Sequence, residues 1–355
     1  KIHLIKNTLF KEENDFFKVL NFGFLKLNKL LDNSSGFLSG KDAFFLHDTY
    51  GVPIDFILDV VKEGNFFVDI DNFNILMENQ KKISKNCEKF VFNKSYLFDF
   101  DKTKFLGYEE SVVKSVVLRI FKNNISVFNL SSGDSASIVL DKTVCYVESG
   151  GQISDVGFIF IDNVFYFKVT NIINNNGYFE HIGYVENGNI DLFDLVYVSF
   201  DINYRNNISK NHTATHLLNK VLRVLLGNNV FQKGSLVSYD KFRFDFNYDF
   251  FINSDMIFKI EEVINNIIFS NFSVSSYYLD FYQARDKDVL FLQGEDYNDN
   301  VRVIDINNGY SIEACCGTHV KNTGSIGFFK IIYESGVSKG IRRFECKTGI
   351  YSFYY

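Results

Sequence analysis

Two pairs of potential metal ligands stand out in this sequence. His212 and His216 are four residues apart, at the start of a run whose leucines and valines recur at helical spacing. Residues at i and i+4 lie on the same helical face, so both imidazoles can point at one spot. About a hundred residues later, Cys315 and His319 repeat the four-residue spacing. An isolated histidine pair is more often structural, but the four side chains together form a set that typically binds zinc tetrahedrally.

The spacing leaves the role of the metal open. The helix of many zinc proteases carries a glutamate between two histidines as general base, but no acidic residue separates His212 from His216. A closed site with four protein ligands would be structural, whereas exchange of one ligand for water would give a Lewis acid that activates the water. We expect one zinc ion per chain and keep both alternatives.

Short β-rich runs dominate the middle of the chain. From residue 112 onward, runs of β-branched and aromatic residues are separated by turns rich in Asn, Gly and Asp. Many short strands at this spacing are typical of a small β-barrel. The runs are 116–121, 125–130, 137–140, 158–161, 164–169 and 195–200.

Helical spacing dominates the first part of the chain and returns around the histidine pair. Apolar residues recur every three or four positions in the ranges 1–35, 54–63, 70–86 and 254–271, and a further helix starts at Arg205. Residues 87–110 are interpreted as a polar connection. The sequence therefore predicts an α+β protein in three parts: a helical segment at 1–108, a β-barrel at 109–203 and a zinc-containing domain at 204–355.

Composition narrows the class of protein. A chain of 355 residues with 46% hydrophobic and 23% charged residues is ordinary for a soluble protein of two or three domains. Five cysteines, two of them adjacent, argue against a disulfide framework. A net charge of −6 gives no overall attraction to nucleic acid, so phosphate binding would need local basic patches. Without a signal peptide or a long apolar run, we expect a cytoplasmic protein that binds neither membrane nor DNA.

Several motifs resemble the alanyl-tRNA synthetase family in sequence and in order. Residues 211–218, 232–237, 243–246 and 315–320 resemble its editing domain, and further matches extend along nearly the whole chain. The resemblance implies tRNA-Ala as partner and hydrolysis of tRNA-Ala mischarged with serine or glycine.

The need for an editing reaction follows from the limited selectivity of a pocket for alanine, and it indicates which kind of side chain the editing site requires. A pocket for alanine discriminates weakly against serine or glycine, so a second hydrolytic site is needed. Because serine is larger than alanine, that site must recognise the hydroxyl group rather than size. The resemblance places Thr215, Gln232 and Ser235 in the editing pocket, where their polar groups are candidates for this recognition.

Two further motifs suggest contacts with tRNA. Asp48, within residues 43–55, matches an aspartate that the family uses to read the acceptor-stem G·U pair, and a carboxylate can accept a hydrogen bond from guanine. Without the resemblance, His47 and Asp48 would be read as helix-end and turn residues. Gly150 and Gly151 match a turn that faces the tRNA 3′ end, although a bare glycine pair usually marks only a turn.

The remaining candidates are three basic residues, a histidine and a second cysteine. Lys330, Arg342 and Arg343 belong to the densest basic cluster of the sequence and are predicted to contact the tRNA backbone, the alternative being a solvated strand face. His181 is expected at the surface or in a turn and receives no role. Cys316 stands where the family usually has glycine. A second thiol could exchange with Cys315 as ligand or simply be tolerated, and Cys315 is preferred for its spacing to His319.

The chain also departs from the family by omission. We find neither the class II motifs for ATP and amino-acid activation nor the oligomerising domain, which predicts a fragment or one piece of a split enzyme. ATP and Mg²⁺ would serve only the missing ligase core, carried in the second case by a separate chain. Three interpretations remain: part of an alanine–tRNA ligase, a freestanding editing hydrolase, or a non-enzymatic, zinc-stabilised RNA-binding module. The motif at 41–55 argues against the second.

Overall fold

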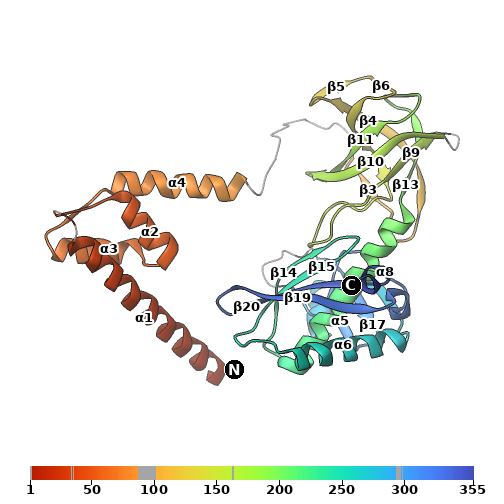
Figure 1. Ribbon diagram of the computed structural model, residues 1–355. Helices are drawn as coiled ribbons and strands as arrows, with labels where there is room; N and C mark the ends of the chain where they lie inside the picture. Colours follow the sequence, from red (N-terminus) through yellow and green to blue (C-terminus); the bar gives the residue numbers. More distant parts are fainter. Residues whose placement is uncertain are drawn as a thin grey trace. The chain divides into compact units, whose positions relative to one another are not determined.

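The computed structural model describes residues 2–32, 34, 36–86, 101–161, 164–292, 297 and 299–355. The chain divides into two compact units, residues 1–97 and 98–355, which are described separately (Figure 1). No helix in the described ranges is long and apolar enough to cross a membrane. Residues 87–100 of the connection expected at 87–110 lie outside the described residues.

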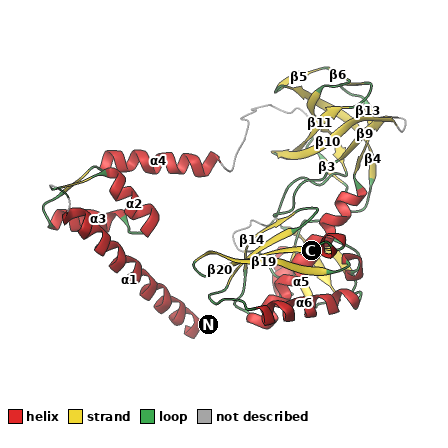
Figure 2. Ribbon diagram, in the orientation of Figure 1, coloured by secondary structure: helices red, strands yellow, loops and turns green. Residues whose placement is uncertain are grey.

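The first unit consists mainly of helices (Figure 2). Gly51 ends the second helix in the left-handed conformation (φ 69°), and its N–H bonds to the carbonyl groups of His47 and Leu46. Pro53 then directly precedes the next helix, whose predicted range 54–63 is confirmed, as is the range 70–86. The elements are α1 (Ile2–Asp32), β1 (Phe37–Leu38), α2 (Gly40–Tyr50), α3 (Ile54–Glu63), β2 (Phe67–Val68) and α4 (Ile70–Asn86).

A closed six-stranded β-barrel opens the second unit and confirms the predicted barrel. The antiparallel strands follow the order β13-β9-β10-β11-β7-β4, and pairing of β4 with β13 closes the ring. Its interior is filled by fully buried side chains such as Val117, Ile138 and Phe167. The six strands are β4 (Val112–Lys122), β7 (Ser135–Leu140), β9 (Gly157–Ile161), β10 (Val164–Asn175), β11 (Tyr178–Val185) and β13 (Leu195–Phe200).

Short strands decorate the barrel. The predicted run at 125–130 is two strands that pair with different partners, β5 with β4 and β6 with β12. Lys104 and Phe105, expected in the polar connection, form a strand that pairs in parallel with β8. These strands are β3 (Lys104–Phe105), β5 (Ile125–Val127), β6 (Asn129–Ser131), β8 (Lys142–Thr143) and β12 (Asn189–Asp191).

His181 corrects one expectation from the sequence. It lies on β11, a strand that was not predicted, and its side chain is fully buried. Its Nε2 lies 2.8 Å from the Thr143 hydroxyl and its Nδ1 lies 3.1 Å from the Ile138 carbonyl. Burial lowers the pKa of His181 to about 4, so the ring is neutral. The placement of His181 at the surface or in a turn was therefore wrong.

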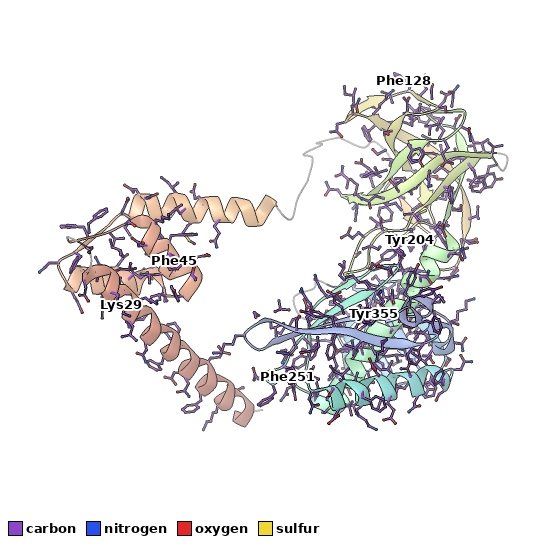
Figure 3. All side chains as sticks on the ribbon, viewed as in Figure 1. Lys29, Phe45, Phe128, Tyr204, Phe251 and Tyr355 are labelled. Atoms are coloured by element: carbon purple, nitrogen blue, oxygen red, sulfur yellow. The ribbon has the colours of Figure 1, made fainter. Side chains whose placement is uncertain are left out.

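The rest of the second unit packs sheets around one long helix, α5 (Ile202–Leu226). The helix was expected from Arg205 but starts three residues earlier, because the Asp201 carboxylate accepts hydrogen bonds from the N–H groups of Asn203 and Tyr204. Tyr204 stacks on Tyr239 at 5.1 Å and lies where the barrel ends (Figure 3). α5 thus follows the last barrel strand directly.

In the described part of this region, two antiparallel sheets and three further α-helices accompany α5. One sheet has the order β14-β15-β20-β19 and the other β16-β17-β18. Their strands are β14 (Gln232–Val237), β15 (Phe242–Asn247), β16 (Val274–Asp280), β17 (Asn300–Ile306), β18 (Ser311–Ala314), β19 (Phe329–Ser338) and β20 (Ile341–Thr348). The helices are α6 (Ser254–Phe269), α7 (Phe281–Asp286), the 3-10 turn η1 (Thr323–Ile326) and α8 (Ile350–Phe353). Together with the barrel, they give a mixed α and β architecture.

Candidate metal centre

The two predicted ligand pairs lie together. His212 and His216 extend from α5, Cys315 and His319 follow β18, and their ligand atoms all lie within 4.8 Å of one another. The Cys315 Sγ is 3.4 Å from Nε2 of His212 and 3.4 Å from Nε2 of His319. With Zn–S near 2.3 Å and Zn–N near 2.0 Å, neighbouring ligands of a tetrahedral zinc lie roughly 3.5 Å apart. The two sulfur–nitrogen distances therefore fit a tetrahedral zinc site.

The protonation states of these side chains also suit a metal. Burial lowers the pKa of His216 to about 3 and holds the pKa values of His212 and His319 well below the usual range. All three imidazoles are therefore neutral at pH 7, as metal ligands must be. Burial raises the pKa of the Cys315 thiol to about 12, so metal binding would release its proton.

Nδ1 of His319 forms a hydrogen bond, whereas Nδ1 of His216 only approaches a carboxylate. The Thr213 hydroxyl donates its only hydrogen to the Ser209 carbonyl at 2.9 Å, so at 3.1 Å it must accept one from His319 Nδ1. This leaves the lone pair of His319 on Nε2. The Nδ1 of His216 faces the Glu313 carboxylate at 3.5 Å. A hydrogen bond such as that of His319 orients a metal-binding imidazole, and Nδ1 of His216 makes none with the described residues.

Glu313 is itself held in place within the protein. Its carboxylate accepts hydrogen bonds from Asn219 Nδ2 at 3.2 Å and from the Ser311 hydroxyl at 3.1 Å. Burial raises its pKa to about 7. Analysis of the sequence did not select this residue, although a signal was available: Glu313 and Cys315 are two positions apart at the end of a strand, where alternate side chains share a face.

A cavity of about 190 Å³ lies beside the candidate metal ligands, and Thr215, Gln232 and Ser235, the three predicted pocket residues, all line it. The Thr215 hydroxyl donates to the Asn211 carbonyl at 2.8 Å, so only its lone pairs are available to the cavity. Gln232 Nε2 donates to the Ser235 hydroxyl at 3.1 Å, which leaves the Ser235 hydrogen for another acceptor. The wall thus offers both accepting and donating hydroxyl groups.

The glycine pair lies at the edge of this cavity. Gly150 lines the cavity, and Gly151 packs on β14, where its carbonyl accepts from the Val237 N–H at 2.7 Å. Gly151 has φ +80°, and a Cβ there would lie 2.6 Å from the Ser235 hydroxyl and 2.7 Å from its carbonyl oxygen. Both the conformation and the close approach require glycine.

Arg302 and Tyr108 support the loop that carries Cys315, and analysis of the sequence missed both. The buried Arg302 guanidinium donates to the carbonyl groups of Cys315 and Gly317 at 3.0 and 2.8 Å. The guanidinium carbon lies 3.8 Å from the centre of the Tyr108 ring. The Tyr108 hydroxyl in turn donates to the Cys316 carbonyl. The Cys316 side chain is exposed, and its sulfur is not a member of the ligand group.

Unlike Gly150, the basic residues predicted to contact tRNA are not part of the cavity wall, and Asp48 belongs to the other unit. Asp48 is exposed on α2 in the first unit and accepts a hydrogen bond from Gln80. The three basic residues lie on β19 and β20, and each is paired with a carboxylate. Lys330 pairs with Glu261 at 2.9 Å, Arg342 with Glu334, and Arg343 with Asp245 through two bonds of 2.7 Å. Their charges are thus partly neutralised within the protein.

Comparisons of the sequence with known proteins relate this chain to tRNA synthetases. The model of class II (A) tRNA synthetases matches residues 1–204, more than half of the chain. The model of the threonyl and alanyl tRNA synthetase second additional domain matches residues 301–345. The chain therefore belongs to the class II (A) tRNA synthetase family.

Curated relatives are named as one particular ligase of that family. The alanine–tRNA ligase of Buchnera aphidicola subsp. Schizaphis graminum is 42% identical over 352 residues, which is 98% of this chain and 40% of the relative. The alanine–tRNA ligase of Neisseria gonorrhoeae is 38% identical over 347 residues, again 98% of this chain and 40% of the relative. The chain thus spans about 40% of the length of these relatives.

Proposed function

We propose that this chain is the tRNA-contacting and editing portion of an alanine–tRNA ligase, which attaches alanine to tRNA-Ala with ATP. The observation that carries the proposal is the convergence of His212, His216, Cys315 and His319 beside a cavity walled by hydroxyl groups. The names of the relatives and the match of the second additional domain support it. ATP and Mg²⁺ would serve the aminoacylation core of such a ligase, whether that core lies on the same polypeptide or on a separate one.

In the editing reaction the four ligands would hold one zinc ion, which supplies Lewis acidity or a fixed point for the terminal ribose. The protein residues bind and orient the mischarged end. Ser235, oriented by Gln232, has a hydroxyl hydrogen to donate, and Thr215 has lone pairs to accept. These two hydroxyl groups can bind the side-chain hydroxyl group of serine. Alanine has no such group. Alanine would leave them unpaired, which disfavours the correct product at this site.

The remaining predicted contacts complete the proposal. Asp48 would read the acceptor stem, and the turn at Gly150 and Gly151 would face the 3′ end of the tRNA. At Lys330, Arg342 and Arg343, a backbone phosphate would compete with the carboxylates that now pair with them. The division into a helical segment at 1–108, a barrel at 109–203 and a zinc-containing domain at 204–355 is part of this proposal.

The test is hydrolysis of Ser-tRNA-Ala, Gly-tRNA-Ala and Ala-tRNA-Ala by the whole chain, with and without a chelator. We expect release of serine but little release of alanine, and loss of activity in the chelator and in Cys315→Ala. Because glycine also lacks the hydroxyl group, its release would require a feature of the cavity other than the hydroxyl groups of Ser235 and Thr215. Normal deacylation by zinc-free Cys315→Ala would contradict the metal's role. A chain that binds zinc but deacylates nothing would contradict editing and favour the RNA-binding module.

A further inference from the structure

Gln152 connects the barrel half of the second unit to the candidate metal centre. Its side chain is fully buried in the turn that follows Gly151, sixty residues before the first ligand. The Oε1 atom lies 2.7 Å from Nδ1 of His212 and accepts a hydrogen bond from the Thr318 N–H at 2.9 Å. The Nε2 atom donates to the Thr318 hydroxyl at 3.0 Å.

These contacts fix which end of the amide faces His212. The backbone N–H of Thr318 can only donate, so the atom it meets must be the amide oxygen of Gln152. An oxygen at that position can only accept, so Nδ1 of His212 must carry the hydrogen. The lone pair of His212 is therefore on Nε2, the nitrogen that lies 3.4 Å from Cys315 Sγ.

The backbone around Gln152 is held as firmly as its side chain. The turn pairs with the end of β14 through the Val237 N–H to the Gly151 carbonyl at 2.7 Å and the Ile153 N–H to the Val237 carbonyl at 3.1 Å. A Cβ at Gly317 would lie 2.9 Å from the amide oxygen of Gln152 and 2.0 Å from Cε1 of His212. Gln152, His212 and Gly317 thus pack without spare room.

We propose that Gln152 is a positioning residue of the metal site, which sets the tautomer and orientation of His212 from the barrel side. The inference rests on the metal site proposed above and extends it: the barrel half supplies a part of the site that the four ligands alone lack. Partners of this kind typically change metal affinity by about 10–100-fold when removed.

The first test compares zinc affinity in the whole chain by competition with a chromophoric chelator. Gln152→Met keeps the volume but removes the acceptor, so we expect zinc affinity about 10–100-fold weaker and an altered visible spectrum of the Co²⁺ form. Gln152→Glu keeps an acceptor toward His212 and should restore most of the affinity. Ser154→Ala is the matched control, because Ser154 is buried in the same segment but bonds to Asn171.

The second test needs no substitution and covers the case in which Gln152→Met fails to fold. In metal-free wild-type chain labelled with ¹⁵N-histidine, long-range proton–nitrogen correlation should show His212 protonated on Nδ1 only. Protonation on Nε2 instead would overturn the proposal, as would Gln152→Met with wild-type zinc affinity and Co²⁺ spectrum. A wild-type chain that binds no zinc would overturn the metal site itself, which separates the two failures.

Discussion

Arg205 and Asp155 form a buried ion pair at the point where α5 leaves the barrel. Nε of Arg205 donates to the two carboxylate oxygens at 2.9 and 3.0 Å, and the remaining nitrogens donate to the carbonyl groups of Gly107 and Val144 at 2.8 and 2.9 Å. The guanidinium also lies 3.8 Å from the centre of the Phe200 ring. One side chain thus ties three segments of the barrel half to the helix that carries His212.

Loss of this pair should destabilise the second unit strongly. Arg205→Met would leave Asp155 buried without a counter-charge, and breaking a buried pair in this way costs about 3–5 kcal/mol. Urea unfolding of the whole chain measures the effect. Lys259→Met is the matched control, because the Lys259–Glu262 pair is exposed and should contribute little. Equal effects of the two substitutions would show that the Arg205 pair contributes little to stability.

The two adjacent cysteines should differ in their effect on metal binding. Cys315→Ala removes a ligand atom and should abolish stoichiometric zinc after dialysis, whereas Cys316→Ala should retain one zinc per chain because its sulfur lies outside the ligand group. Atomic absorption gives the zinc content, and the Co²⁺ form gives the sulfur-to-metal charge-transfer band. Zinc loss in Cys316→Ala with retention in Cys315→Ala would reassign the ligand.

A methyl group at Gly317 should disturb the metal site. Gly317→Ala places a carbon 2.0 Å from Cε1 of His212, so the ring must move, and overpacking of this kind costs about 1–3 kcal/mol. We expect weaker zinc binding and a lower Tm. Gly234→Ala is the control, since a Cβ there meets only ordinary contacts at 3.5 Å or more. Unchanged zinc affinity in Gly317→Ala would mean that the loop adjusts freely.

Buried His181 should make the barrel sensitive to acid. Its pKa is about 4 in the folded chain against an ordinary 6.5, so below pH 6.5 the unfolded chain binds the proton more readily and stability falls. One pKa unit corresponds to about 1.4 kcal/mol, so this group alone removes up to roughly 3 kcal/mol by pH 4.

The comparison of wild type with His181→Gln isolates this effect. Urea midpoints at pH 7 and pH 5, measured with excess chelator so that the metal-site histidines contribute equally, should show a flatter pH dependence in the variant. Parallel pH profiles for the two proteins would indicate that His181 does not change its protonation on unfolding in this range.

Local patterns were sufficient for the ligand pairs and for five of the helices, whereas no range was predicted for α2, α7 or α8. The range 54–63 follows Pro53, and the spacing of His212 and His216 is a helical repeat, so both are visible within a few residues. Strand β11 was missed because Glu180 and His181 made it look exposed. Both are buried because the barrel supplies partners: Glu180, for example, accepts from the Ser137 hydroxyl at 3.0 Å. Such partners come from distant strands.

The same reason explains which site residues could not be predicted. Gln152 lies sixty residues from His212, and Tyr108 still farther from Arg302, so no spacing rule brings them together. The basic residues Lys330, Arg342 and Arg343 were conspicuous as a cluster, but their pairing with carboxylates depends on strand register and on α6. Sequence patterns identify groups that share one element, whereas contacts between elements follow from the tertiary fold.

Tyr108 precedes the barrel strands but contacts Arg302 and Cys316 in the domain that follows the barrel. This contact limits how the two halves of the second unit can be recombined. Because the Tyr108 ring covers Arg302 and its hydroxyl bonds to the Cys316 carbonyl, the half that carries the candidate metal ligands cannot be exchanged independently of the barrel half. Consider a hybrid that takes residues 204–355 from one homologue and the barrel from another. It should bind zinc as the parent chains do only if tyrosine and glutamine are retained at positions 108 and 152. The activity of such hybrids would then depend on whether the barrel and residues 204–355 are compatible, rather than on the stability of either part alone.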